Sequence, residues 1–309
     1  MRDITLDGKR IADETPAWVC AEIGHNHGGS FDQARKLIQA AAACGADACK
    51  FQKRDNATLY TAEMLAQPYE NENSFGKTYG EHRAALEFGE RDYIASAAVA
   101  RASHITFFAT AFDEPSVDFL AGLQVPILKL ASAAVVDAAF LRYASATGLP
   151  LILSTGGATW PDVDRAVNIL EAGRSPFALL HCTAAYPVRS YSELNLAAIV
   201  AMRARYPATV IGWSGHVSGI AASIQAYAYG ARILEHHFTL DRTLKGTDHA
   251  FSLEPVGLRK LVRDLQRAHE ATGDGIKRMY HSEKKPLAKM RRHPTPDGPR
   301  ITGSTYAGY

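Results

Sequence analysis

The sequence contains little cysteine, and nothing in its spacing pairs the few that are present. Among 309 residues there are four cysteines and no CxxC motif. Because all four lie in apolar or helix-like segments, the pattern favours reduced, buried thiols over a disulfide framework or a zinc site. We therefore expect a protein of a reducing compartment, the cytoplasm, whose cysteines take no catalytic role.

Long apolar runs and an excess of charge of one sign are also missing. No stretch approaches the roughly 18 apolar residues that a membrane-spanning helix needs, and the residues after Met1 form no apolar leader core. The formal net charge is only +2, so no sequence-wide field favours nucleic acid or an anionic membrane. The sequence predicts small-molecule partners, no nucleic acid and no membrane, with any anion site confined to one place.

What the sequence has instead is a regular alternation of strand-like apolar runs with helix-like stretches. Strands are predicted near residues 17–23, 46–52, 104–110, 125–130, 149–154, 177–183, 209–214 and 231–238. Helices are predicted near residues 31–44, 91–103, 115–122, 138–146, 159–171, 193–204, 217–229 and 255–270. Eight such pairs predict an α/β fold, the (β/α)8 TIM barrel, as a single domain over residues 1–285.

Two segments depart from this alternation. Residues 53–90 are far longer than the usual βα loop of about 2–6 residues, and their aromatic side chains include Tyr79 close to His82. We predict that this segment is an ordered lid over the C-terminal mouth of the barrel. Residues 286–309 are rich in proline, glycine and polar groups, and we predict a short irregular tail there and no separate domain.

Polar or ionisable residues end nearly every predicted strand, where a TIM barrel builds its active site. Lys50 and Lys129 end the second and fourth strands, and a buried lysine is costly unless it is paired. Together with nearby hydroxyl groups they favour a site for a phosphate and a carboxylate; the hydroxyls belong to Thr110, Ser132, Ser154 and Ser214. The alternative is that each lysine forms a structural ion pair with an internal Asp or Glu.

Histidines end the seventh and eighth predicted strands. His216 and His237 come from neighbouring strands, so both imidazoles can reach one point above the barrel, and such a pair suits a catalytic divalent ion such as Mn²⁺. Because side chains alternate along a strand, only one of the adjacent His236 and His237 can face that point. Local hydrogen bonding by packed histidines is the competing interpretation.

Two carboxylates complete the candidate chemistry. Glu22 ends the first strand, where it could bind the metal, carry a proton or orient a substrate hydroxyl. A structural ion pair with Lys50 is the alternative. Asp248 follows the eighth strand and could hold a polyol substrate or a metal-bound water, or it could simply be solvated.

Many short motifs recur in order between about residue 15 and about residue 290. They are Ala21-Glu-Ile-Gly-His-Asn-His-Gly, Lys50-Phe-Gln, Thr78-Tyr-Gly-Glu-His-Arg, Lys129-Leu-Ala-Ser, Leu153-Ser-Thr-Gly, Leu180-His-Cys-Thr, Trp213-Ser-Gly-His, Glu235-His-His-Phe and Gly246-Thr-Asp-His. In this combination the chain resembles the sialic acid synthase family, the phosphoenolpyruvate-dependent synthases of N-acetylneuraminate and related nonulosonates.

The resemblance implies a role for each strand end. It implies that phosphoenolpyruvate is bound by Lys50, Thr110, Lys129, Ser132, Ser154 and Ser214. It implies catalysis by Glu22, which would handle a proton, and by His216 and His237, which would hold Mn²⁺ or Mg²⁺. Acceptor binding is expected of Gln52, Tyr186 and Asp248, and of the lid residues Tyr79 and His82.

The chain departs from the family pattern on the acceptor side. Ala133 and Ala134 follow Ser132 where the family has a polar pair with a carboxylate, and Ala184 stands where an amide or hydroxyl is usual. Gly215 replaces the acidic residue before the metal histidine. The family's C-terminal antifreeze-like domain, which donates an arginine across a homodimer, is not among these 309 residues. We therefore expect an altered acceptor, and the assembly that the resemblance implies is a homodimer.

The predicted reaction is the condensation of phosphoenolpyruvate with an open-chain, sugar-like aldehyde to give a 2-keto-3-deoxy acid and phosphate. Such a transferase needs both lysines and the hydroxyl groups. Another metal-dependent barrel, an aldolase or a hydrolase, needs only the histidines. A non-catalytic binding barrel is the third interpretation, and the missing acidic residues favour it.

Overall fold

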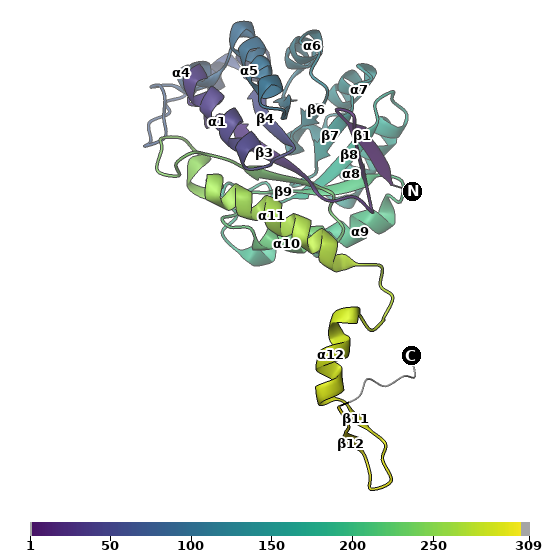
Figure 1. Ribbon diagram of the computed structural model, residues 1–309. Coiled ribbons are helices and arrows are strands. Elements are labelled where there is room, and N and C mark those ends of the chain that lie inside the picture. The colour runs from purple at the N-terminus through teal and green to yellow at the C-terminus, as the bar shows by residue number, and fades with distance from the viewer. Residues whose placement is uncertain (1, 304–309) are drawn as a thin grey trace. The chain divides into compact units, whose positions relative to one another are not determined.

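Eight parallel strands close into a barrel in the structure, a computed structural model that describes residues 2–303. The chain forms two compact units, residues 1–269 and residues 270–309. The barrel strands are β3 (Trp18–Gly24), β4 (Ala48–Lys53), β5 (Thr106–Ala111), β6 (Leu128–Leu130), β7 (Leu151–Ser154), β8 (Phe177–Cys182), β9 (Val210–Gly215) and β10 (Ile233–His237), and β10 pairs with β3 to close the ring (Figure 1). This confirms the predicted TIM barrel.

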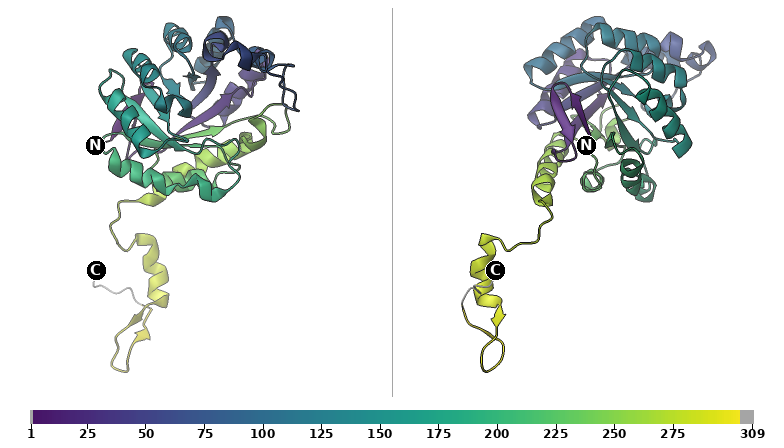
Figure 2. Two further views of the ribbon diagram at one scale, coloured as in Figure 1. Left: turned by 180° about the vertical axis from the view of Figure 1, so that it is seen from behind. Right: turned by 90° about the vertical axis from the view of Figure 1, so that its right-hand side faces the viewer.

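Helices separate the strands and cover the outer face of the barrel (Figure 2). They are α1 (Phe31–Ala43), α5 (Glu90–Ala102), α6 (Glu114–Gly122), α7 (Ala138–Ala146), α8 (Trp160–Glu171), α9 (Ala197–Arg205), α10 (Ala221–Ala228) and α11 (Pro255–Thr272). Short 3₁₀ turns lie at η1 (Ser132–Val136), η2 (Tyr191–Leu194) and η3 (His249–Phe251). Side-chain oxygens of Ser30, Asp113 and Asp137 cap α1, α6 and α7, which fixes where these helices begin.

A hairpin that the sequence analysis did not predict precedes the barrel. Strands β1 (Asp3–Leu6) and β2 (Lys9–Ala12) pair through a turn at Asp7 and Gly8, both with positive φ. Leu6 and Ile11 belong to the same buried cluster as Trp18 inside the barrel. The hairpin therefore extends the inner core, and its Asp-Gly turn was the sequence signal for it.

The long connection after β4 is ordered around its own aromatic side chains. It contains α2 (Asn56–Leu59), α3 (Ala62–Leu65) and α4 (Tyr79–Leu86). The His82 ring is 3% exposed and packs against Tyr69 and Phe75. The backbone N–H of Gly246, on the loop after β10, donates to Asn73 Oδ1 at 3.0 Å. The predicted order of this segment is confirmed, while its function as a lid remains a prediction.

Part of the segment predicted to be an irregular tail, residues 286–309, has regular structure, and residues 304–309 lie outside the described residues. Helix α12 (His281–Met290) runs through residues 286–290, and β11 (Arg292–His293) pairs with β12 (Arg300–Ile301). Pro286 lies inside this helix and its surroundings are polar, so the segment gives little helical signal in the sequence. None of the helices among residues 2–303 has the length and apolarity needed to cross a bilayer.

Candidate active site

The inner core of the barrel shows which residue of each strand faces the mouth. Trp18 and Cys20 of β3 belong to the cluster inside the barrel, whereas Val19 belongs to the layer between strands and helices. The same division holds for Ile233 and Leu234 of β10. Because side chains alternate along a strand, continuing this parity points a polar residue inward at the C-terminal end of every barrel strand except β8. These residues are Glu22, Lys50, Gln52, Thr110, Lys129, Ser154, Ser214, Glu235 and His237.

Lys50 lies at the centre of these inward side chains. Its Nζ is 2.5 Å from Glu22 Oε2 and 3.6 Å from Glu235 Oε2, and it donates to Thr110 Oγ1 at 2.7 Å. Burial opposes the charge on Lys50, but Glu22 and Glu235 outweigh that effect and raise the pKa of the ammonium group. Lys50 thus forms the structural ion pair that was the alternative interpretation. It also faces the mouth, as the anion-site interpretation requires.

Lys129 is a second buried cation, and it has no carboxylate within ion-pair distance among residues 2–303. Its Nζ donates to Ser154 Oγ at 2.6 Å and to the Leu130 carbonyl at 3.1 Å. Burial lowers the pKa of Lys129, and the more distant charge of Glu235 opposes this shift. An ammonium held in this way is available to an anionic ligand.

Glu235 is a site residue that the sequence analysis did not assign. Its Oε1 accepts a hydrogen bond from Ser214 Oγ at 2.8 Å while its other oxygen faces Lys50. Burial favours the neutral acid, but Lys50 and then Lys129 hold the pKa of Glu235 below its ordinary value. The signal was present in the sequence, because Glu235 and His237 are two residues apart on one strand and share a face.

Two histidines from neighbouring strands meet beside this cluster. The rings of His216 and His237 have centroids 5.4 Å apart, and His216 Nδ1 bonds to the Thr183 carbonyl at 2.9 Å. Burial and the neighbouring His237 lower the pKa of His216 to about 3, which keeps that imidazole neutral. Asp248 Oδ2 lies 3.5 Å from His237 Nδ1. His236 instead points to the outer layer, where its ring contacts Trp213.

The two histidines fit a divalent metal ion. The hydrogen bond between His216 Nδ1 and the Thr183 carbonyl leaves Nε2 as the ligand atom and fixes the orientation of the ring, as is usual for a metal-binding histidine. His237 Nδ1 is buried and has no hydrogen-bond partner among residues 2–303. In the same part of the chain no group of three or more His, Cys, Asp or Glu side chains is arranged to hold a metal. A metal here would therefore complete its coordination with water or substrate oxygens.

A small cavity of about 50 Å³ brings most of the predicted residues together. Its lining includes Glu22, Lys50, Gln52, Thr110, Lys129, Ser132, Ser154, Tyr186, Ser214, His216, Glu235 and His237. Ser132 Oγ accepts from the Gly156 N–H at 3.0 Å, and Tyr186 lies over His216 with ring centroids 4.2 Å apart. Tyr79, His82 and Asp248 do not line this cavity, and their predicted contact with an acceptor stays a prediction.

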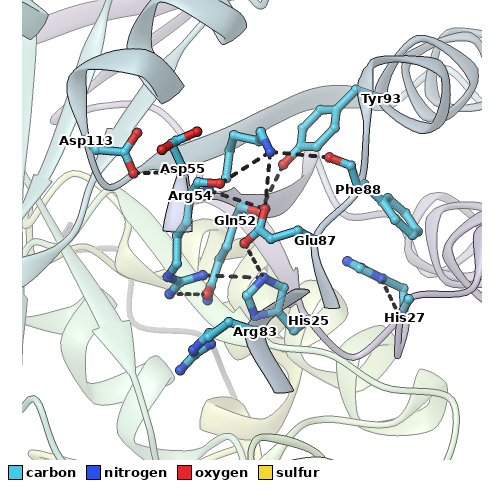
Figure 3. A network of polar contacts seen from close by, with 12 residues as sticks. His25, His27, Gln52, Arg54, Asp55, Arg83, Glu87, Phe88, Tyr93 and Asp113 are labelled. Atoms are coloured by element: carbon cyan, nitrogen blue, oxygen red, sulfur yellow. Dashed lines mark hydrogen bonds and ion pairs between the residues drawn. The ribbon is translucent and has the colours of Figure 1, made fainter. Parts of the chain in front are cut away.

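A polar network at the base of the lid connects to this cavity through Gln52 (Figure 3). Gln52 Nε2 donates to Glu22 Oε1 at 2.7 Å, and Gln52 Oε1 accepts from Arg54 Nη2 at 2.8 Å. The guanidinium group of Arg54 stacks on the Phe112 ring, 3.6 Å from its centroid, and contacts His25 Nε2 at 3.3 Å. The sequence analysis assigned no role to Arg54 or His25.

Packing against Trp213 explains why the residue between Ser214 and His216 is a glycine. A Cβ at Gly215 would lie 2.2 Å from the ring of Trp213. Trp213 is 1% exposed and points to the outer layer, as does position 215 two residues later. An aspartate at position 215 would therefore require the Trp213 ring to move.

Comparison with known proteins shows which family has this sequence pattern. The sequence model of the NeuB family matches residues 37–277. The chain is 37% identical over 276 residues to the N-acetylneuraminate-9-phosphate synthase of Mus musculus, covering 89% of this chain and 77% of that protein. It is 35% identical over 281 residues to the N,N'-diacetyllegionaminic acid synthase of Legionella pneumophila, with coverages of 89% and 78%.

A solved structure with the same architecture is that of an N-acetylneuraminic acid (sialic acid) synthetase from Leptospira borgpetersenii in complex with citrate. The TM-score is 0.80 at 34% identity, and the match covers 93% of this chain and 95% of that chain. A truncated 3-deoxy-D-arabino-heptulosonate 7-phosphate synthase from Thermotoga maritima reaches a TM-score of 0.68 at 12% identity, covering 89% and 94%. That likeness shows the fold alone.

Proposed function

The chain belongs to the NeuB family, and from that premise we propose that it is a synthase that condenses phosphoenolpyruvate with an open-chain sugar aldehyde. The products are a 2-keto-3-deoxy acid and inorganic phosphate. The Mus musculus relative is named for a 9-phosphate product and the Legionella pneumophila relative is not. Family membership therefore leaves open whether the acceptor carries a phosphate.

The observation that carries the proposal is the pair of buried lysines in one small cavity. Lys50 and Lys129 both line it, and each already bonds to a hydroxyl group, of Thr110 and of Ser154. Phosphoenolpyruvate carries a phosphate and a carboxylate, so two cations with hydroxyl donors match its two anionic ends. An aldolase or hydrolase acting on a neutral substrate has no need of a second buried cation without a carboxylate partner.

The reaction balances without a further reagent. The C3 carbon of phosphoenolpyruvate bonds to the aldehyde carbon, whose oxygen takes a proton. The oxygen of one water molecule bonds to C2. The bond between C2 and the bridging oxygen then breaks, so that phosphate leaves with that oxygen and C2 becomes a ketone. Lys50 and Lys129 stabilise the negative charge on the phosphate and carboxylate throughout, because the buried site holds them in place before the reaction begins.

Glu22 is the residue that we assign to proton transfer. Its carboxylate is 2% exposed, faces Lys50 and accepts from Gln52 Nε2. It can take the proton of the attacking water while Gln52 holds it in position. His216 and His237 would hold Mn²⁺ or Mg²⁺, which when bound would polarise the aldehyde oxygen.

The cellular compartment and the partners of the enzyme are also part of the proposal. All four cysteines are buried and unpaired, which fits a reducing compartment such as the cytoplasm, where disulfides are rare. The partners proposed are phosphoenolpyruvate and an aldehyde. The homodimer expected from the family resemblance stays a prediction.

The test is release of phosphate from phosphoenolpyruvate with a panel of aldoses, with Mn²⁺ and with a chelator. In ¹⁸O-water the released phosphate should contain no label, because the C–O bond breaks, and mass spectrometry should find a keto acid three carbons longer than the aldose. Labelled phosphate would identify a hydrolase that cleaves the P–O bond. Release of phosphate with no aldose required would equally exclude the synthase, and no release with any aldose would favour a binding barrel.

A further inference from the structure

Two arginines come together at the base of the lid, next to the donor cavity but outside it. Arg54 follows β4 directly, and Arg83 lies on α4. Figure 3 shows both guanidinium groups on the same side of the His25 ring, away from Phe88 and Tyr93. Burial and then the charge of Arg83 lower the pKa of Arg54, which is the effect of two cations held near each other.

Neither arginine has a carboxylate partner within ion-pair distance among residues 2–303. The nearby carboxylate of Glu87 lies 3.3 Å from Lys53 Nζ and 3.5 Å from His25 Nε2. Arg54 reaches Glu87 only through its backbone N–H, at 3.3 Å. Since Lys53 and Glu87 offset each other, the cluster keeps about two uncompensated positive charges.

Arg54 is held firmly but is not neutralised. It is 7% exposed, its Nη2 donates to Gln52 and its guanidinium plane rests on Phe112. Its Nε is buried and has no hydrogen-bond partner among residues 2–303. A buried cation with an unused donor and no counter-ion is costly to keep, and an anionic ligand would repay that cost.

Hydroxyl groups complete the set of donors. Arg83 Nε donates to Tyr79 Oη at 2.9 Å, and the Tyr79 and Tyr60 hydroxyls are 3.4 Å apart. Burial opposes the ionisation of Tyr79, but its hydrogen bond with Tyr60 and the charge of Arg83 lower the pKa of the Tyr79 hydroxyl. Two planar guanidinium groups with two phenols suit a phosphate dianion, which guanidinium groups bind through paired hydrogen bonds.

The position of the cluster relates it to the acceptor. Asp248 Oδ2 lies 3.5 Å from His237 Nδ1, and Arg54 Nη1 lies 3.3 Å from His25 Nε2. Gln52 lines the donor cavity together with His237 and accepts a hydrogen bond from Arg54 Nη2 at 2.8 Å, so Arg54 lies directly beside that cavity. An open-chain aldose whose aldehyde lies at the two metal-site histidines would extend its far end toward the two arginines.

We propose that Arg54 and Arg83 bind a phosphomonoester on the acceptor, at the end of the sugar opposite the aldehyde. The second substrate is then an aldose phosphate, and Arg83 makes the lid part of the specificity site. This inference rests on the proposed condensation and adds the class of its acceptor.

The experiment compares matched pairs of acceptors: N-acetylmannosamine with its 6-phosphate, and mannose with its 6-phosphate. For the wild-type chain we expect the phosphorylated member of at least one pair to have a kcat/KM about 100-fold higher or more. Arg83→Gln should reduce that ratio by about tenfold or more. Arg91→Gln, which removes an exposed charge from α5, is the matched control and should keep the wild-type ratio.

A wild-type ratio near one in both pairs, or an unchanged ratio in Arg83→Gln, overturns the proposal. Binding separates this failure from that of the proposed function. With phosphoenolpyruvate present to fill the donor cavity, calorimetry compares the unreactive alditol of each sugar with its 6-phosphate. Tighter binding of the phosphate ester that weakens about tenfold in Arg83→Gln supports the anion site even if no aldose is turned over. Equal binding of both alditols counts against it whatever the activity.

Discussion

The ammonium group of Lys50 lies 2.5 Å from the Glu22 carboxylate, and the two residues occupy paired positions on neighbouring strands of the barrel. Glu235 approaches the same ammonium group at 3.6 Å. Two buried carboxylates and two buried lysines therefore share the mouth, and their formal charges cancel. An anionic donor that enters must compete with Glu22 for Lys50, so the ion pair weakens ground-state binding of the substrate while it holds both groups in place.

Glu22→Gln should separate binding from turnover. The amide keeps the shape of the side chain and removes one negative charge beside Lys50, so phosphoenolpyruvate should bind at least as tightly as in the wild-type chain. Turnover should fall by about 10²–10⁴-fold, the usual contribution of a general acid or base. Calorimetry and phosphate release measure the two quantities. Glu90→Gln, exposed on α5, is the control, and wild-type turnover in Glu22→Gln would remove Glu22 from the mechanism.

The two lysines should differ in what they contribute to stability. Lys129→Met removes a buried cation without a carboxylate partner within ion-pair distance, so the melting temperature should hold or rise. Lys50→Met leaves Glu22 and Glu235 buried without a counter-ion, which should cost about 3–5 kcal/mol of unfolding free energy. Both variants should bind phosphoenolpyruvate about tenfold more weakly or worse. Equal melting temperatures would show that the ion pair is not what stabilises the mouth.

The histidines give a prediction about metal content. His216→Ala and His237→Ala should lose bound Mn²⁺ and turnover, whereas His236→Ala should lose much less of either, because His236 points to the outer layer against Trp213. Metal analysis of the purified variants after dialysis measures this. Removal of the metal with a chelator should stop turnover of the wild-type chain, and Mn²⁺ should restore it. Equal metal loss in all three variants would contradict the assignment.

Strand parity explains how much of this site could be predicted from the sequence. A strand of known direction places every second residue on one face, so the inward positions of Lys50 and Lys129 follow once the strands are located. The same rule could have predicted that Glu235 faces inward, because it lies two residues before His237 on β10. The pairing of Lys50 with Glu22 was foreseen only as an alternative, because strand register and the choice of partner depend on how the barrel closes.

The cluster at the lid base could not be predicted in this way. Arg54 and Arg83 are separated by a segment whose course follows no simple period, and aromatic packing such as that of His82 against Tyr69 decides where it folds back. Helix α12 was hidden for a different reason, since Pro286 interrupts its pattern. Site residues could be predicted from the sequence at the ends of regular strands. They could not be predicted where tertiary contacts alone bring residues together.

Gly215 offers a prediction about stability. Gly215→Ala should place a methyl group against Trp213, at 2.2 Å before relaxation, and overpacking of this kind costs about 1–3 kcal/mol. Thermal unfolding of the variant measures the loss. Adding Trp213→Leu makes room for the methyl group, so Gly215→Ala should cost less in that background than alone. Independent, additive effects of the two substitutions would show that the ring is not what excludes a side chain at position 215.

The acceptor is where this chain differs most from the family pattern. Ala134 stands where a carboxylate is expected and Ala184 where an amide or hydroxyl is usual, and each replacement removes a partner for a hydroxyl group of the acceptor. Ala184 also borders Gly156. A Cβ added at Gly156 would lie 2.9 Å from the Ala184 methyl group, so a larger residue at position 184 has little room on that side.

We expect unphosphorylated N-acetylmannosamine to be a poor substrate. A site that has lost its hydrogen-bonding groups no longer favours a sugar whose hydroxyls those groups would bind. Steady-state assays with N-acetylmannosamine and with simpler aldehydes measure this preference. A kcat/KM for N-acetylmannosamine of about 10⁴ M⁻¹s⁻¹ or more would mean that water or longer side chains replace the missing groups.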